Sequence, residues 1–243
     1  MSEVQEIVRA HDRDRYLSTL FAPDGKRPHL LALYAFNAEV TRIRDQVSDP
    51  GIGLIRLQWW RDTLENGAAQ GHPVAEALLS TIRDFALPVE ALTDLLSARE
   101  FDLYQDRMPG LTELEAYLGE TSSRLIQMAA MILDRAAAPK ASEAAGLAGV
   151  AHGLAKILAD PRHRAPFLPP GMDVMGAIAH AEKRLDQALS LLATLPKSVL
   201  PAFLPLSLTA GDLKTIVKTP GSPRLPAPLR RQMTMWWTAR RWG

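Results

Sequence analysis

The feature of this sequence that most constrains its fold is the helical spacing of apolar residues along nearly the whole chain. Through residues 28–49 and again through 52–65, apolar side chains recur three or four positions apart. That period places them on one face of a helix. Further helices are predicted over residues 88–106, 111–134, 141–159, 172–194 and 197–218. No run of β-branched residues has the length and bounding turns of a strand, so the sequence predicts an all-α protein.

Prolines mark one clear linker. Residues 219–228 contain four of them, which stiffen the chain into an extended connection. The predicted organisation is a helical domain over residues 1–218, a linker over 219–228 and a C-terminal segment over 229–243. That segment combines four arginines with three tryptophans, which suits a helix lying on an anionic membrane surface or on a partner. It equally suits a helix that packs on the domain through its aromatic face, and we favour this packing.

Composition excludes several classes of function. With 243 residues and a net charge of +1, the chain lacks the global field that would favour nucleic acid. The absence of cysteine rules out a disulfide framework and thiolate metal sites. The first fifteen residues resemble neither a signal peptide nor a transit peptide, and no apolar run reaches the length of a membrane span. We expect a cytoplasmic protein, with peripheral contact at the inner face of the membrane as an alternative.

One pair of acids has the spacing of a metal site. Asp45 and Asp49 stand four residues apart, which in one continuous helix puts both carboxylates on the same face. Such a pair suits Mg²⁺, which prefers carboxylate oxygens. The alternative is that both acids lie on the surface and pair with Arg42 or Arg44.

A second segment carries a single acid among cations. Asp160 is flanked by Lys156, Arg162 and Arg164. At about 4 Å and an effective dielectric constant near 20, two unit charges interact by roughly 4 kcal/mol, so fixed cations can take the place of a metal ion. We expect Lys156 or Arg164 to reach the first acidic pair and to neutralise it without Mg²⁺.

The predicted helix over 141–159 is rich in small residues, including Gly146, Gly149 and Gly153. Each glycine costs a helix roughly 1 kcal/mol relative to alanine. Close approach of a neighbouring helix would account for them, and so would a ligand lying against the backbone. We favour close packing.

Several segments, taken in order, resemble the squalene/phytoene synthase family. They are residues 14–23, 31–39, 55–62, 98–103 and 167–169, and the resemblance covers residues 12–195. It implies an isoprenoid-synthase-type helical bundle around a central apolar cavity. Catalytic members of the family join two prenyl diphosphates head to head, and two acidic motifs hold Mg²⁺ against the diphosphates.

The chain departs from the family at the second acidic motif. The positions that the resemblance assigns to this motif are Gly153, Lys156, Ala159, Asp160 and Arg164. Only Asp160 keeps an acid. Residues 35–39, 44–48, 53–60, 201–205 and 236–242 are similar to a subgroup of the family that assists the assembly of respiratory complex I and shares the broken motif.

We therefore expect a non-catalytic protein that binds a prenyl or lipid-like ligand or acts in respiratory complex I assembly, through contact with the subunits of that complex. The expected ligand-binding residues are Tyr34, Arg42, Lys156, Arg162 and Arg164. The competing interpretation is an active Mg²⁺-dependent transferase that joins farnesyl or geranylgeranyl diphosphate head to head. In that case Asp45, Asp49 and Asp160 are the catalytic residues, with Mg²⁺ bound to the first two.

Overall fold

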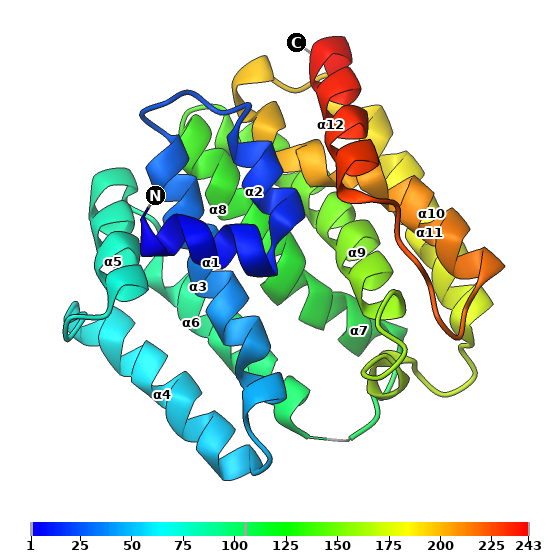
Figure 1. Ribbon diagram of the computed structural model, residues 1–243, viewed down its shortest axis with the longest axis horizontal. Coiled ribbons are helices and arrows are strands. Elements are labelled where there is room, and N and C mark those ends of the chain that lie inside the picture. Colours follow the sequence, from blue (N-terminus) through cyan, green and yellow to red (C-terminus); the bar gives the residue numbers. More distant parts are fainter. Residues whose placement is uncertain (1, 105, 243) are drawn as a thin grey trace.

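The computed structural model describes residues 2–104 and 106–242, and within them every regular element is helical (Figure 1). The all-α prediction is confirmed. The α-helices are α1 (Glu3–His11), α2 (Arg13–Thr19), α3 (Arg27–Gln46), α4 (Pro50–Asn66), α5 (Pro73–Phe85), α6 (Val89–Arg99), α7 (Leu111–Leu118), α8 (Arg124–Leu133), α9 (Ser142–Leu158), α10 (Val174–Leu192), α11 (Thr209–Lys218) and α12 (Pro228–Trp242). Shorter helical turns join them: η1 (Glu100–Leu103), η2 (Gly119–Ser123), η3 (Ala138–Ala141), η4 (Ala165–Phe167) and η5 (Lys197–Leu208). None of the helices in the described ranges is both long enough and apolar enough to cross a bilayer.

Helix α3 ends three residues before the end of the helix that the apolar pattern predicts over residues 28–49. Helix α3 ends at Gln46, and Val47 is extended, with φ −125° and ψ 144°. Helix α4 begins at Pro50, with Asp49 as its N-cap. Proline disfavours the helical conformation in the residue before it, and its own fixed φ suits the first position of a helix. The prediction of a helix through residue 49 is therefore wrong, because Pro50 starts a new one.

Three other predicted helices are interrupted. The one over residues 88–106 forms α6 and then the 3₁₀ turn η1, which ends at Leu103. Residues 111–134 form α7, a π-helical turn (η2) and α8 in succession. Residues 197–208 form the 3₁₀ helix η5, which contains Pro201 and Pro205. Each proline lacks the backbone N–H that an α-helix needs. Helices α1, α2 and α5 are not among the segments that the sequence predicts.

Helix α9 lies between α8 and α10 and contributes to two buried apolar clusters (Figure 1). Its alanines pack in the larger cluster with α3, α5, α6 and α8. Its C-terminal half, with Leu154 and Leu158, packs in the second cluster with α7, α10 and α11. Helix α9 is therefore central to the fold, because residues of both apolar clusters belong to it.

The glycines of α9 allow the π-helical turn to approach closely. A Cβ atom at Gly149 would lie 2.3 Å from the backbone of Ser123, and one at Gly153 would lie 2.4 Å from the side chain of Ser122. At Gly146 nothing lies within 4 Å of the added atom. Close packing is therefore confirmed as the reason for two of the three glycines.

The C-terminal helix α12, red in Figure 1, packs against α2 and η5. Met235 is fully buried against Leu17 and Leu208. Trp236 and Trp237 are 40% and 57% exposed. The segment thus packs on the domain as we favoured, through Met235 and the partly buried Trp242, while Trp236 and Trp237 remain exposed.

An ion-pair cluster holds α12 in place. Arg231 is buried and donates to Asp14 of α2 at 2.7 and 2.9 Å and to Asp212 of α11 at 2.5 and 2.9 Å. Lys156 of α9 donates to the same Asp14 at 2.8 Å. Burial alone would raise the pKa of Asp14, but the hydrogen bonds and charges of Arg231 and Lys156 outweigh it and hold this pKa well below its usual range. Four helices are therefore tied together by paired charges.

Candidate functional site

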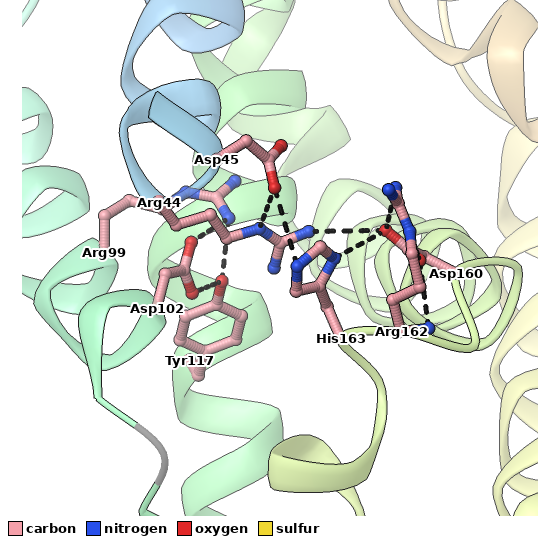
Figure 2. Close-up of polar contacts among 8 residues, drawn as sticks. All are labelled: Arg44, Asp45, Arg99, Asp102, Tyr117, Asp160, Arg162 and His163. Atoms are coloured by element: carbon pink, nitrogen blue, oxygen red, sulfur yellow. Dashed lines mark hydrogen bonds and ion pairs between the residues drawn. The ribbon is translucent and has the colours of Figure 1, made fainter. Parts of the chain in front are cut away.

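The candidate site lies where the C-terminal turn of α3 meets the loop after α9 (Figure 2). Helix α3 supplies Arg44 and Asp45, and the loop supplies Asp160, Arg162 and His163. An acid near the C-terminus of a helix opposes the helix dipole. A cation close to Asp45 is therefore favoured, and the site provides several.

His163 joins the two acids. Its Nδ1 donates to Asp160 Oδ2 at 2.9 Å, and its Nε2 lies 3.5 Å from Asp45 Oδ1. Arg44 makes a second link, with Nε 4.0 Å from Asp45 and Nη2 3.9 Å from Asp160. Arg162 donates to Asp160 at 3.2 Å. The chain's own side chains thus occupy the space between the two carboxylates.

Asp160 stays ionised at neutral pH. Partial burial would raise its pKa, but the hydrogen bonds from His163 and Arg162 lower it below the usual value. Its negative charge is therefore available to Arg44 and the other cations around it.

Asp49 is not part of this cluster. Its Oδ1 accepts the Gly51 backbone N–H at 2.7 Å, which caps α4. Because α3 ends before Asp49, Asp45 and Asp49 do not share a helix face, and the prediction that they do is wrong. The residue one turn before Asp45 on α3 is Thr41. The neighbour on that face is therefore a hydroxyl group, not a second carboxylate.

Lys156 and Arg164 do not reach the first acidic pair. Lys156 is engaged with Asp14, and Arg164 Nη1 donates to the backbone carbonyl of Pro220 at 2.5 Å. The expectation that one of these cations neutralises Asp45 or Asp49 is therefore wrong. The side chains near Asp45 are instead Arg44, the adjacent residue on α3, and the imidazole of His163.

The other expected ligand-binding residues have different surroundings. Tyr34 is buried beside Arg15, whose guanidinium carbon lies 5.8 Å from the ring centroid, and burial raises the pKa of Tyr34 to about 12. Arg42 lines the cavity described next. Arg162 is 78% exposed and borders an open groove.

A cavity of about 200 Å³ lies beside the acids, between α3, η2 and α9. Its wall carries five cations: Arg15, Arg42, Arg44, Arg99 and Lys156. Asp12 is the single acid of that wall among the described residues. The cavity wall is therefore charged, whereas the resemblance implies an apolar cavity.

Arg99 is anchored in the cavity wall by a three-residue network (Figure 2). Its Nη1 donates to the Tyr117 hydroxyl at 2.7 Å and to Asp102 Oδ2 at 3.1 Å, and the Tyr117 hydroxyl donates to Asp102 Oδ1 at 2.6 Å. Burial raises the pKa of Tyr117. Neither Arg99 nor Tyr117 was predicted from the sequence. The three-residue spacing of Arg99 and Asp102 was the available signal, and Tyr117 had none.

The sequence model of the family described as squalene/phytoene synthase matches residues 8–165, a range that includes α3, most of the cavity wall and Asp160. This chain belongs to the squalene/phytoene synthase family. The human protein "NADH dehydrogenase (ubiquinone) complex I, assembly factor 6" is 31% identical over 228 residues, covering 82% of this chain and 68% of that protein. A phytoene synthase from Arthrospira platensis is 27% identical over 116 residues, covering 46% of this chain and 37% of that protein.

A solved structure agrees with this assignment. The squalene synthase from Alicyclobacillus acidocaldarius matches with a TM-score of 0.70 at 19% identity, covering 91% of this chain and 94% of that one. At this identity the match establishes the fold alone. This squalene/phytoene synthase family member therefore has the helical architecture of that enzyme.

The side chains of this family member do not fit the Mg²⁺ that the family's acidic motifs imply. Across the described residues, no group of three or more acidic, histidine or cysteine side chains is placed to hold a metal ion. The buried Nε atoms of Arg44 and Arg99 have no hydrogen-bond partner, and they are N–H donors. A metal ion needs lone pairs. The unsatisfied groups call for an anion.

Proposed function

We propose that this family member is a non-catalytic protein that acts in the assembly of a respiratory NADH dehydrogenase, in contact with subunits of that complex, and that it requires no metal ion. One observation carries the proposal: Arg44 and His163 fill the space between Asp45 and Asp160. The similarity to the human assembly factor over 82% of the chain supports the same role.

The proposal includes peripheral contact with the inner face of the membrane, where such a complex is built. The exposed rings of Trp236 and Trp237 support it, together with Arg240, whose guanidinium carbon lies 4.1 Å from the Trp236 ring centroid. Tryptophan and arginine on one helix suit the boundary between lipid head groups and acyl chains.

Deletion of the gene in the cells that produce the protein tests the assembly role. The amount of fully assembled NADH dehydrogenase, measured on native gels by activity staining, should fall several-fold and return with the wild-type gene. A variant carrying both Asp45→Ala and Asp160→Ala should restore it as well, because the proposal gives these acids no chemical step. An unchanged amount of enzyme in the deletion strain would contradict the role.

A Mg²⁺-dependent head-to-head prenyltransferase is the second candidate. Asp45 and Asp160 approach the same histidine ring from α3 and from the loop after α9, as opposed acids of a diphosphate clamp would. Purified protein is incubated with farnesyl or geranylgeranyl diphosphate and Mg²⁺, and diphosphate release and extractable hydrocarbon are followed. We expect no release. A condensed product whose formation Asp45→Ala abolishes would establish the enzyme instead.

A further inference from the structure

Helix α4 carries apolar side chains on a face that is not buried. The helix packs against α3, α6 and η1, where residues such as Leu57 and Trp60 are buried. Ile52 and Ile55, in contrast, are 49% and 70% exposed, and the partly exposed Trp59 follows four residues after Ile55. Residues three and four apart lie on the same face of a helix. Ile52, Ile55 and Trp59 therefore form an exposed apolar stripe along two turns of α4.

The stripe ends at an aromatic pocket between α3, α4 and the start of α5. This pocket has a volume of about 310 Å³, and its wall includes Trp59, Trp60 and His72. The three rings contact one another, with centroids 5.0, 5.2 and 5.5 Å apart. Trp60 also packs on the core residue Phe36, at a centroid distance of 5.0 Å. The aromatic wall is thus fixed in advance, which reduces the entropy that binding costs.

The same pocket has an excess of positive charge. Within the described parts of the chain, Arg42 makes no hydrogen bond or ion pair, and Arg56 donates to the neutral amide of Gln46 at 2.6 Å. Glu39 is the acid of the described pocket wall, and its Oε2 already lies 3.5 Å from His72 Nε2. A carboxylate from outside the chain would form charge-assisted hydrogen bonds with the two arginines. The pocket therefore favours an acidic partner.

The composition of this surface is that of a protein interface. Tryptophan and arginine are the residues that most often dominate the binding energy of such interfaces, and the pocket has two of each. Its volume of about 310 Å³ is at the lower end of the roughly 300–1,000 Å³ of small-molecule pockets. The apolar stripe extends beyond the pocket along α4. The combined surface therefore suits a protein segment that places one side chain in the pocket.

We propose that the α4 surface, which consists of the apolar stripe and the aromatic pocket, docks an acidic amphipathic helix of a partner protein. An apolar side chain of that helix fills the pocket, and a carboxylate beside it pairs with Arg42 and Arg56. The inference rests on the assembly role and adds the chemistry of the partner segment. Figure 1 shows α4 and α12 at opposite ends of the molecule. A chain whose α12 lies on a membrane thus keeps its α4 surface free for a protein.

Photo-crosslinking in the cells that produce the protein tests the α4 surface. The photoreactive residue benzoylphenylalanine replaces Ile55 in one full-length chain and Leu189 in a control chain. Leu189 is also apolar and 40% exposed, but it lies on α10. We expect position 55 to form an adduct with a protein segment rich in Asp and Glu, and position 189 to form at least tenfold less of it. Adding Arg56→Glu to the position-55 chain should reduce the adduct at least tenfold, because like charges then face each other.

Several results would overturn the docking proposal. They are no adduct at position 55, equal adducts at both positions, and an adduct with a lipid, with a basic segment or with a second copy of this chain. An adduct whose yield does not change with Arg56→Glu would overturn it too. If circular dichroism shows that Arg56→Glu does not fold, Arg42→Gln takes its place, because it removes a side chain that pairs with nothing in the described parts of the chain.

The deletion strain separates this proposal from the assembly role. Full-length chains with Ile55→Asp or Leu189→Asp are compared for the amount of NADH dehydrogenase that they restore. We expect Ile55→Asp to restore several-fold less than the wild type, and Leu189→Asp to stay within twofold of it. Full restoration by Ile55→Asp would overturn the docking surface and leave the assembly role intact. Undiminished enzyme in the deletion strain would instead overturn the assembly role, and the crosslinking result would then decide the docking surface on its own.

Discussion

Arg231 is a buried cation with an acidic partner on each side. Its guanidinium lies between the carboxylates of Asp14 and Asp212, and Lys156 completes a set of two acids and two bases. A buried charge that loses its partner is costly, because the low-dielectric interior cannot solvate it. The stability of the fold should therefore depend strongly on this arginine.

Replacement of Arg231 by methionine should lower the free energy of unfolding by about 3–5 kcal/mol, because it leaves two carboxylates without their main partner. Urea denaturation followed by circular dichroism measures the change. Arg230→Met is the control, since Arg230 is exposed on the same helix and should change stability by less than about 0.5 kcal/mol. Equal effects of the two substitutions would show that the buried cluster contributes nothing specific.

The same cluster predicts how stability responds to acid. The folded state holds the pKa of Asp14 well below its usual value, so the folded protein keeps this carboxylate ionised where the unfolded chain takes up a proton. Its contribution is fully present above about pH 4 and is lost as the pH falls further, towards the folded-state pKa. In Asp14→Asn, the unfolding free energy should be lower at pH 7 and should fall less steeply below pH 4. A variant with the wild-type slope would place the acid sensitivity elsewhere.

At the scale of single residues, some members of the site could be predicted from the sequence, but their partners could not. Asp45 was recognisable from its four-residue spacing to Asp49, and Asp160 was recognisable as a single acid among cations. Lys156 was visible too, but its partner lies 142 residues earlier in the chain. No local pattern predicts such a pairing, because it depends on how α2 and α9 pack.

At the scale of elements, the contact between α9 and η2 depends on the absence of a side chain. Gly149→Ala should destabilise the protein by about 1–3 kcal/mol or more, since its Cβ atom would meet the Ser123 backbone at 2.3 Å. Gly146→Ala lies on the same helix with open space around it, so it should stabilise the protein by up to about 1 kcal/mol. Thermal unfolding of both variants measures the contrast, and a shift of the same sign in both would contradict the packing.

Helix boundaries were the least predictable property of the elements. Apolar spacing predicted a helix across residues 47–49, where the chain turns, because spacing does not register the conformational restriction that Pro50 imposes on Asp49. Capping chemistry identifies the boundary, since Asp followed by Pro is a common start of a helix. This capping signal is local, and it places Asp45 and Asp49 in different helices.

At the scale of the whole molecule, helical periodicity was enough to predict the class of fold. The resemblance along residues 12–195 predicted the family. The way α12 closes the fold could not be predicted, because its buried contacts are made with α2 and η5, which are distant in sequence. The division into a domain, a linker and a C-terminal segment remains a proposal.

Limited trypsin digestion tests that division. The first cut should fall after Arg224, which is exposed in the non-helical stretch between α11 and α12. The C-terminal fragment should still elute with the rest of the protein on size exclusion, because Arg231 and Met235 hold it by non-covalent contacts. In Arg231→Met the fragment should separate. Immediate separation in the wild type would mean that the covalent link alone keeps α12 in place.

The sequence separation of Asp14 and Arg231 also determines when their ion pair can form during synthesis of the chain. The two residues are 217 positions apart, and at roughly 5–20 residues per second the ribosome needs on the order of ten seconds or more to make the second after the first. During that interval the carboxylate has no arginine and must remain hydrated. A nascent or prematurely ended chain therefore shows an uncovered acid at its first helices.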